Sequence, residues 1–186
     1  MNQLSEDIIL IERSLKGEQQ AFKLLYQNYK QSLFMVCLRY AKDKMTAQDY
    51  LQEAFISIFK KLNYFDPAKG VFESWAKRIT INACLMHIRQ QSLYTISMQG
   101  EIDVESKDAN ALSDLGLQEM LKMIQQLPQG YKTIFNMYVI DGYSHKEIAS
   151  ELNISINTSK TQLKKARTAL QKKILDNQQS YRMTHG

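Results

Sequence analysis

Hydrophobic side chains recur at intervals of three and four residues along most of the chain, which predicts amphipathic helices rather than strands. In the second such segment, for example, Leu25, Tyr29 and Leu33 fall on one helix face. A stretch that contains Pro67 and Gly70 interrupts the pattern between the third and fourth segments. The pattern predicts four helices in the first half of the chain, over about residues 5–16, 18–42, 46–63 and 72–91.

The helical pattern stops after the fourth segment. Residues 94–112 are polar and acidic and have no sustained period, which is typical of a linker. Helices are expected to resume near residue 112 and again at Pro128, which can occupy the first turn of a helix that Gly142 ends. We therefore expect an all-α fold with two helical domains joined by a flexible linker. The expected segments are a first domain, the linker, a second domain and a short tail, over residues 1–93, 94–112, 113–178 and 179–186.

Two helix starts lie close together in residues 142–167, "GYSHKEIASELNISINTSKTQLKKAR". Ser144 and Glu147 have the S-x-x-E spacing of a capping box, in which each side chain bonds a backbone amide of the other residue. The helix that follows is expected over about residues 145–152. The three residues "NIS" interrupt it, and Ser155 can cap the next helix. Two helices joined by such a short turn are typical of a helix-turn-helix.

The second helix of this pair has two different faces. At 100° per residue, one side gathers Ser159, Leu163, Ala166 and Leu170, which predicts that this side packs. A basic and polar helix face can enter a major groove, where lysines meet phosphates and polar side chains reach base edges. A solvated lysine face on a C-terminal helix is the alternative. The opposite side carries Lys160, Thr161, Lys164, Lys165 and Arg167.

The charge of the chain is distributed in three blocks. Residues 1–95 carry 13 Lys and Arg against 9 Asp and Glu, residues 96–120 carry 1 against 6, and residues 121–186 carry 10 against 4. Two basic blocks around an acidic one fit two domains and a linker. A basic chain with a net charge of +5 permits a nucleic-acid partner, but many proteins of this charge have none.

Membrane insertion and catalysis find no support in the sequence. No apolar run approaches the roughly 18 residues of a membrane span, and the acidic start has no signal-peptide cleavage site, so we expect a cytoplasmic protein. No nucleophile–base pair, metal cluster or phosphate loop is present, and we expect no enzyme, no cofactor and no metal. Cys37 and Cys84 lie in apolar helical patterns, which predicts buried free thiols. His87 is expected to be a surface or core residue.

The two halves of the chain independently resemble the extracytoplasmic-function (ECF) group of bacterial sigma-70 RNA polymerase sigma factors. The C-terminal stretch "QQLPQGYKTIFNMYVIDGYSHKEIASELNISINTSKTQLKKARTAL" resembles the DNA-binding motif of that family and the segment before it. "TAQDYLQEAFISIFKKL" resembles its polymerase-binding helix, and "FDPAKGVFESWAKRITINACLMHIRQQ" resembles its promoter-melting segment. The resemblance covers about residues 15–175. It implies a sigma factor that binds core RNA polymerase and promoter DNA and directs transcription initiation.

The resemblance also implies a role for one face of the third helix. Asp49, Gln52 and Glu53 share that face because they are spaced at i, i+3 and i+4. In the family this face contacts the coiled-coil clamp of the polymerase largest subunit; a solvated acidic face is the alternative.

The resemblance implies that the linker passes through the polymerase toward the RNA path. The sequence leaves open whether an anti-sigma factor is a further partner.

The loop "NYFDPAKGVF" resembles the family loop that captures an unstacked base of the minus-ten element. An aromatic face can stack a flipped base, and a lysine can meet a phosphate. A place in the core is the alternative for Tyr64 and Phe72, and Trp75 is expected to pack beneath the loop. The resemblance implies minus-ten contacts by Tyr64, Phe65, Lys69, Phe72, Lys77, Arg78 and Arg89.

The second helix of the helix-turn-helix resembles the recognition helix that touches the minus-thirty-five element. Ser159 departs from the family, which usually has an apolar residue there, and its polar side chain is expected to weaken the seating of the helix. Lysine lacks the bidentate fork of arginine, so a promoter preference cannot be copied from other members. The implied contacts are Asn157, Thr158, Lys160, Thr161, Lys164 and Lys165, to which the basic face adds Arg167.

Two other classes of function fit part of the pattern. A dimeric helix-turn-helix regulator would bind operators through residues 142–175, but it leaves the first 93 residues without an assigned role. A helical adaptor would use its basic face to bind an acidic protein. Weak salt dependence of DNA binding would favour the adaptor, because phosphate contacts release counterions and steepen that dependence.

Overall fold

A computed structural model describes residues 3–96 and 115–185 of the chain. All regular structure in these ranges is helical, and the described residues fall into two compact units on either side of residue 100. The prediction of an all-α fold is confirmed. The expected linker lies outside the described residues, except for its first three, which belong to the end of a helix.

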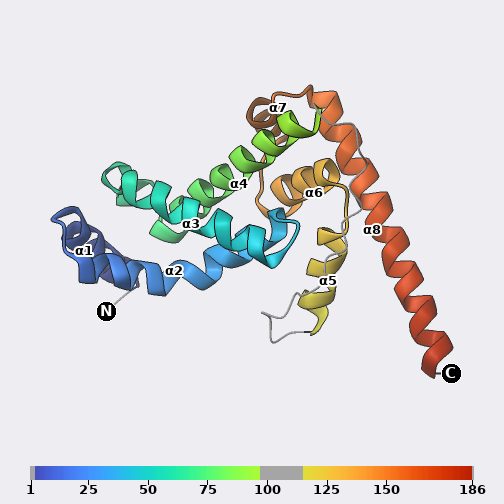
Figure 1. Ribbon diagram of the computed structural model, residues 1–186, viewed down its shortest axis with the longest axis horizontal. Coiled ribbons are helices and arrows are strands. Elements are labelled where there is room, and N and C mark those ends of the chain that lie inside the picture. The colour runs from blue at the N-terminus through green and yellow to red at the C-terminus, as the bar shows by residue number, and fades with distance from the viewer. Residues whose placement is uncertain (1–2, 97–114, 186) are drawn as a thin grey trace. The chain divides into compact units, whose positions relative to one another are not determined.

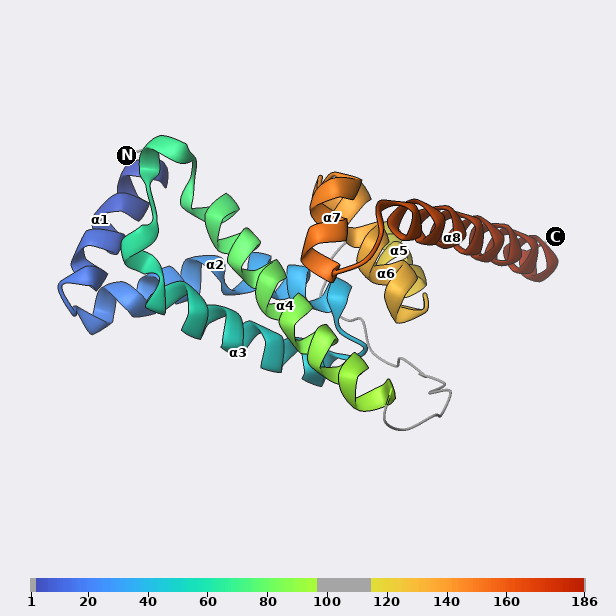
Figure 2. The ribbon, with the colours of Figure 1, turned by 90° about the horizontal axis from the view of Figure 1, so that it is seen from above.

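The first unit is built from four helices joined by short connections (Figure 1). Figures 1 and 2 show α2, α3 and α4 side by side and α1 against α2. Two 3-10 turns connect α3 to α4. The elements are α1 (Gln3–Leu15), α2 (Gln19–Tyr40), α3 (Lys44–Lys60), η1 (Leu62–Tyr64), η2 (Pro67–Lys69) and α4 (Phe72–Ile96).

Local sequence explains where these helices end. Gly17 takes a φ of 85° between α1 and α2, a conformation that glycine adopts without steric cost. Asp43 caps α3, because its carboxylate accepts a hydrogen bond from the Thr46 backbone N–H at 2.7 Å. Burial alone would raise the pKa of Asp43, but the hydrogen bonds from Thr46 lower it below its usual value. The hydrophobic pattern predicted a start at about Thr46, and the cap places the start of α3 two residues earlier.

The core of the first unit joins side chains from all four helices, and it contains the face predicted for the second helix. Cys37 and Cys84 are both buried and free, as expected. A hydrogen bond with Cys37 and burial raise the pKa of Cys84, so its thiol stays protonated. The central cluster consists of Ile11, Leu25, Tyr29, Leu33, Phe55, Ile58, Leu62, Phe72, Ala76 and Ile79.

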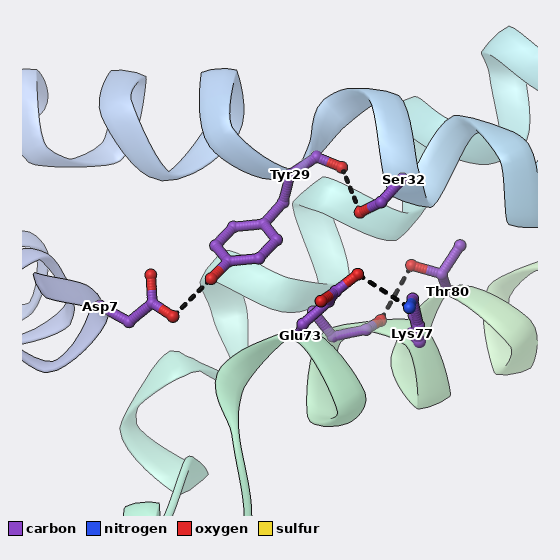
Figure 3. A network of polar contacts seen from close by, with 7 residues as sticks. Asp7, Tyr29, Ser32, Glu73, Lys77 and Thr80 are labelled. Atoms are coloured by element: carbon purple, nitrogen blue, oxygen red, sulfur yellow. Dashed lines mark hydrogen bonds and ion pairs between the residues drawn. The ribbon is translucent and has the colours of Figure 1, made fainter. Parts of the chain in front are cut away.

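A set of polar contacts holds α1 on α2 and steadies α4 (Figure 3). The hydroxyl of Tyr29 donates a hydrogen bond to the buried carboxylate of Asp7. Within α4, the hydroxyl of Thr80 donates to the Ala76 carbonyl at 2.9 Å, and Lys77 pairs with Glu73 at 2.8 Å. Because buried polar groups are costly unless they are hydrogen-bonded, the Asp7–Tyr29 contact fixes where α1 lies on α2.

The second unit contains α5, α6, a π-helical turn, α7 and α8, and its core lies between them. Pro128 is the N-cap of α6, one position before the first-turn place expected for it. Gly142 takes a φ of 75° beyond the π-helical turn. The last helix runs beyond residue 178, where we expected a short tail to begin. The bounds are α5 (Leu115–Gln125), α6 (Gln129–Phe135), η3 (Asn136–Ile140), α7 (His145–Leu152) and α8 (Ile156–His185).

Candidate nucleic-acid and partner-binding surfaces

A three-residue turn joins α7 and α8 into a helix-turn-helix (Figure 2). The capping box is present, with the Glu147 backbone N–H donating to Ser144 Oγ at 3.2 Å and the Ser144 backbone N–H donating to the Glu147 carboxylate at 2.8 Å. Asn153 ends α7 in the left-handed conformation, with a φ of 53°. Ser155 caps α8 by accepting from the Thr158 backbone N–H at 2.9 Å. The motif and both of its caps are therefore as predicted.

The two faces of α8 differ as its sequence predicts. Ser159, Leu163 and Ala166 are buried, and Leu170 is half-buried. No aspartate or glutamate occurs between residues 156 and 175, so the outward face of this stretch is basic. The exposed side chains are Asn157, Thr158, Lys160, Thr161, Lys164, Lys165 and Arg167.

Ser159 has a polar partner that the sequence did not indicate. Its hydroxyl lies 2.8 Å from Nδ1 of His145, the first residue of α7. The His145 ring stacks on Tyr138, with the ring centroids 4.3 Å apart and the planes at 24°. Burial, followed by the charges of Lys160 and Arg167, lowers the pKa of His145. The hydroxyl of Ser159 therefore has a hydrogen-bond partner at its buried position. The expectation that Ser159 weakens the seating of α8 did not take this partner into account.

Removing the cap of α7 should loosen the first turn of this helix. We expect Ser144→Ala to destabilise α7 by about 1 kcal/mol, because the Glu147 backbone N–H loses its acceptor. The measurement is hydrogen exchange of the α7 amides, which should become roughly fivefold faster. Ser144→Asp retains an acceptor and serves as the control. Unchanged exchange in Ser144→Ala would contradict a stabilising role for the cap.

The loop between α3 and α4 exposes one aromatic ring and buries another. Tyr64 is 74% exposed, whereas Phe72 is 2% exposed and packs against Tyr29 with ring centroids 5.0 Å apart. Phe65 is half-buried, with ring centroids 5.5 Å from those of both Phe72 and Trp75. Trp75 therefore packs beneath the loop, as expected. Of the two residues whose place was left open, Phe72 lies in the core and Tyr64 faces solvent.

The basic residues of this region lie on the loop and along α4. Lys69 is exposed and pairs with Asp66 at 3.3 Å, and Lys77 is half-buried. Arg78 and Arg89 are exposed, and Nε of Arg89 donates to the Leu85 carbonyl at 3.3 Å. Exposed ion pairs contribute little to stability, so Lys69 can exchange Asp66 for a phosphate at small cost.

His87 makes an aromatic contact inside the first unit. Its ring stacks on Tyr50 of α3, with the ring centroids 4.9 Å apart. Burial is the main cause that raises the pKa of Tyr50 to about 12. This packing agrees with the expectation that His87 is a surface or core residue.

One stripe of α3 faces away from the core. Asp49, Gln52 and Glu53 are all exposed on it. The structure adds Met45, which is 72% exposed, and Ile56, because both follow the same helical spacing. The sequence-based predictions did not include Met45 and Ile56, although their positions opposite the core face of the helix indicated that they are exposed. An acidic surface with exposed apolar side chains suits a protein partner, whereas DNA would be repelled by it.

The described residues contain neither a membrane-spanning helix nor a cluster of metal-ligating side chains. No helix in residues 3–96 or 115–185 is long and apolar enough to cross a bilayer. The same part of the chain contains no group of three or more His, Cys, Asp and Glu side chains placed to hold a metal ion.

Comparison with known proteins gives matches to both units. The family model for sigma-70 region 2 matches residues 25–94, and that for sigma-70, region 4, matches residues 117–170. ECF RNA polymerase sigma factor SigW of Bacillus subtilis strain 168 is 30% identical over 183 residues, which cover 89% of this chain and 95% of the relative. RNA polymerase sigma-H factor of Pseudomonas aeruginosa is 28% identical, with 90% of this chain and 93% of the relative covered.

A solved structure has a related fold. The sigma factor RpoE in its co-crystal structure with the anti-sigma factor NepR, from Bartonella quintana, superimposes with a TM-score of 0.50 and 17% sequence identity. The match covers 81% of this chain and 94% of that one. At this level of identity the likeness concerns the helical fold.

Proposed function

The chain belongs to the ECF group of the sigma-70 family of bacterial RNA polymerase sigma factors, and from this premise we propose that its two units divide promoter recognition between them. As a sigma factor it binds core RNA polymerase and promoter DNA and directs promoter-specific initiation of transcription. Sigma factors are non-enzymatic initiation factors, and the proposal gives this chain no catalytic step, cofactor or metal. It acts in the cytoplasm, where the polymerase works.

The first unit supplies the polymerase contact in this proposal. The exposed stripe of α3 offers Asp49, Gln52 and Glu53 to a basic partner surface, and Met45 and Ile56 extend it with apolar area. Protein interfaces combine apolar contact area with polar and charged groups. The stripe is therefore assigned to the clamp coiled coil of the polymerase largest subunit.

The first unit also opens the minus-ten element. Tyr64 stacks on an unpaired base, and Phe65, held between Phe72 and Trp75, lines the same loop. Lys69, Lys77, Arg78 and Arg89 neutralise the neighbouring phosphates. Phe72 has a supporting part, because its ring is buried beneath the loop.

The second unit reads the minus-thirty-five element. The first turns of α8 enter the major groove, with Lys160, Lys164, Lys165 and Arg167 available to phosphates and base edges. Asn157, Thr158 and Thr161 provide the short polar side chains near the start of this helix.

We assign residues 1–93 to the polymerase-binding and minus-ten domain, residues 94–112 to the linker and residues 113–178 to the minus-thirty-five domain. Two helices run past these boundaries, because α4 extends to Ile96 and α8 to His185. A linker of this length spans at most about 60 Å, so the polymerase sets the distance between the two DNA elements.

An anti-sigma factor is a further candidate partner, and co-purification from cells is the way to detect one.

The observation that carries this division is the placement of the acidic α3 stripe and the basic α8 face in separate units. The test is run-off transcription with purified core polymerase, with and without the chain, on promoter fragments from its own genome. Transcripts that depend on the chain and share a two-part motif support the proposal. Protection of a palindromic site without polymerase would favour the dimeric regulator instead.

The basic face of α8 gives a second test. We expect Lys164→Ala to lower promoter use several-fold and to reduce the slope of log affinity against log salt concentration by about 1, because one phosphate contact is lost. Affinity for core polymerase should stay unchanged. Lys172→Ala is the control, since Lys172 is also exposed on α8 but lies two turns further along. Loss of core binding by Lys164→Ala at unchanged stability would contradict the division between the units.

A further inference from the structure

The first turn of α8 has almost no packing of its own. Among residues 155–161, all of which the structure describes, Ser159 is the one buried side chain. Ile156, the first residue of the helix, is 44% exposed. The next buried side chain, Leu163, lies one turn further along. The position of this turn therefore depends on what holds Ser159.

Ser159 is held by a single polar contact. Its side chain is fully buried, and Oγ lies 2.8 Å from Nδ1 of His145 on α7. Water has no access to compete for this hydroxyl, so the bond is directional and persistent. An apolar residue at this position would pack without fixing a direction, whereas a hydrogen bond sets both a distance and an angle.

His145 is itself fixed from two sides. The capping box between Ser144 and Glu147 holds the backbone at the start of α7. The ring stacks on Tyr138 of the π-helical turn, with its centroid 4.3 Å away. Burial and the nearby charges of Lys160 and Arg167 lower the pKa of His145, so the ring is neutral at pH 7. The contact therefore runs from the π-helical turn through His145 to the first turn of α8.

We propose that His145 and Ser159 are positioning residues, whose hydrogen bond fixes the first turn of α8 and thereby its discrimination between correct and altered minus-thirty-five elements. This inference rests on the proposed function of the second unit. Contacts to base edges require narrow distances and directions. Contacts from long lysine side chains to phosphates tolerate a shift of the helix and carry no sequence information.

The inference predicts a loss of selectivity rather than a uniform loss of binding. The experiment uses the full chain with core polymerase and compares run-off transcription from a cognate promoter with that from a promoter altered at one minus-thirty-five base pair. We expect Ser159→Ala to lower the ratio of the two rates about threefold to tenfold, because a mispositioned base contact loses part of the roughly 1–3 kcal/mol that separates right from wrong bases. An unchanged ratio would overturn the inference.

Two further variants test the hydrogen bond itself. His145→Asn can place an amide nitrogen on the same side-chain branch as Nδ1, and it should restore most of the selectivity that His145→Ala loses. The double variant Ser159→Ala with His145→Ala should be no less selective than either single variant, because both remove the same bond. Independent, additive losses would contradict a shared positioning contact.

A stability control separates positioning from folding. Leu170 is half-buried on the same side of α8 but lies three turns beyond Ser159, so Leu170→Ala should loosen the unit without moving the first turn. If it lowers the selectivity ratio as much as Ser159→Ala, lost stability is the cause and the inference is wrong. If the unaltered chain shows no dependence on the minus-thirty-five element, the proposed function itself fails. Dependence in the unaltered chain with full selectivity in Ser159→Ala rejects the inference alone.

Discussion

Asp49→Lys is expected to abolish most promoter-dependent transcription by lowering the affinity of the chain for core polymerase at least tenfold. Asp49 is exposed in the middle of the α3 stripe, between Met45 and Glu53. A reversed charge facing a basic partner surface costs several kcal/mol, and each 1.4 kcal/mol is about tenfold in affinity. Titration of labelled chain with core polymerase measures the affinity directly, and run-off transcription reports its consequence.

The matched control for this charge reversal is Glu12→Lys. Glu12 is also an exposed acid of the first unit, but it lies on α1 outside the stripe. Both variants change the net charge equally and should unfold like the unaltered chain, because neither side chain is buried. Normal core affinity in Asp49→Lys would remove this stripe from the polymerase contact. An equal loss in Glu12→Lys would mean that total charge, not the stripe, controls binding.

Features that depend on neighbouring residues could be predicted from the sequence. The capping box of Ser144 and Glu147, the cap by Ser155 and the packed side of α8 all follow from spacings of three or four residues, which a helix fixes wherever it lies. The same spacing placed Asp49, Gln52 and Glu53 on one exposed face. These predictions needed no knowledge of how the helices pack together.

Features that depend on tertiary packing could not be predicted in this way. The sequence left open whether Tyr64 and Phe72 lie in the core or in solvent, because both are aromatic residues beside the same loop. The contact between Phe72 and Tyr29 of α2, which places Phe72 in the core, depends on how the helices pack. The sequence predicted that Ser159 is buried but did not indicate its hydrogen-bond partner, because His145 lies 14 residues earlier in the chain. The π-helical turn, which brings Tyr138 onto His145, also has no simple hydrophobic period.

Tyr64→Ala and Phe72→Ala should impair different properties, promoter opening in the first variant and stability in the second, and together they test the minus-ten loop most sharply. Phe72→Ala is expected to destabilise the first unit by about 3–5 kcal/mol, because it empties a core position that touches Tyr29, Phe65 and Trp75. Tyr64→Ala should leave stability unchanged, since that ring is exposed. It should instead reduce promoter opening by about tenfold, through loss of the roughly 1–3 kcal/mol of base stacking.

Two measurements separate these effects within the same variants. Trp75, the single tryptophan of the chain, packs under the loop, so its fluorescence during urea denaturation reports the stability of the first unit. A fluorescent base analogue in the minus-ten element reports opening by the complete polymerase. Tyr64→Phe keeps the stacking face and should open the promoter normally. Normal opening by Tyr64→Ala would remove Tyr64 from the base contact, and a stable Phe72→Ala that fails to open DNA would assign that contact to Phe72.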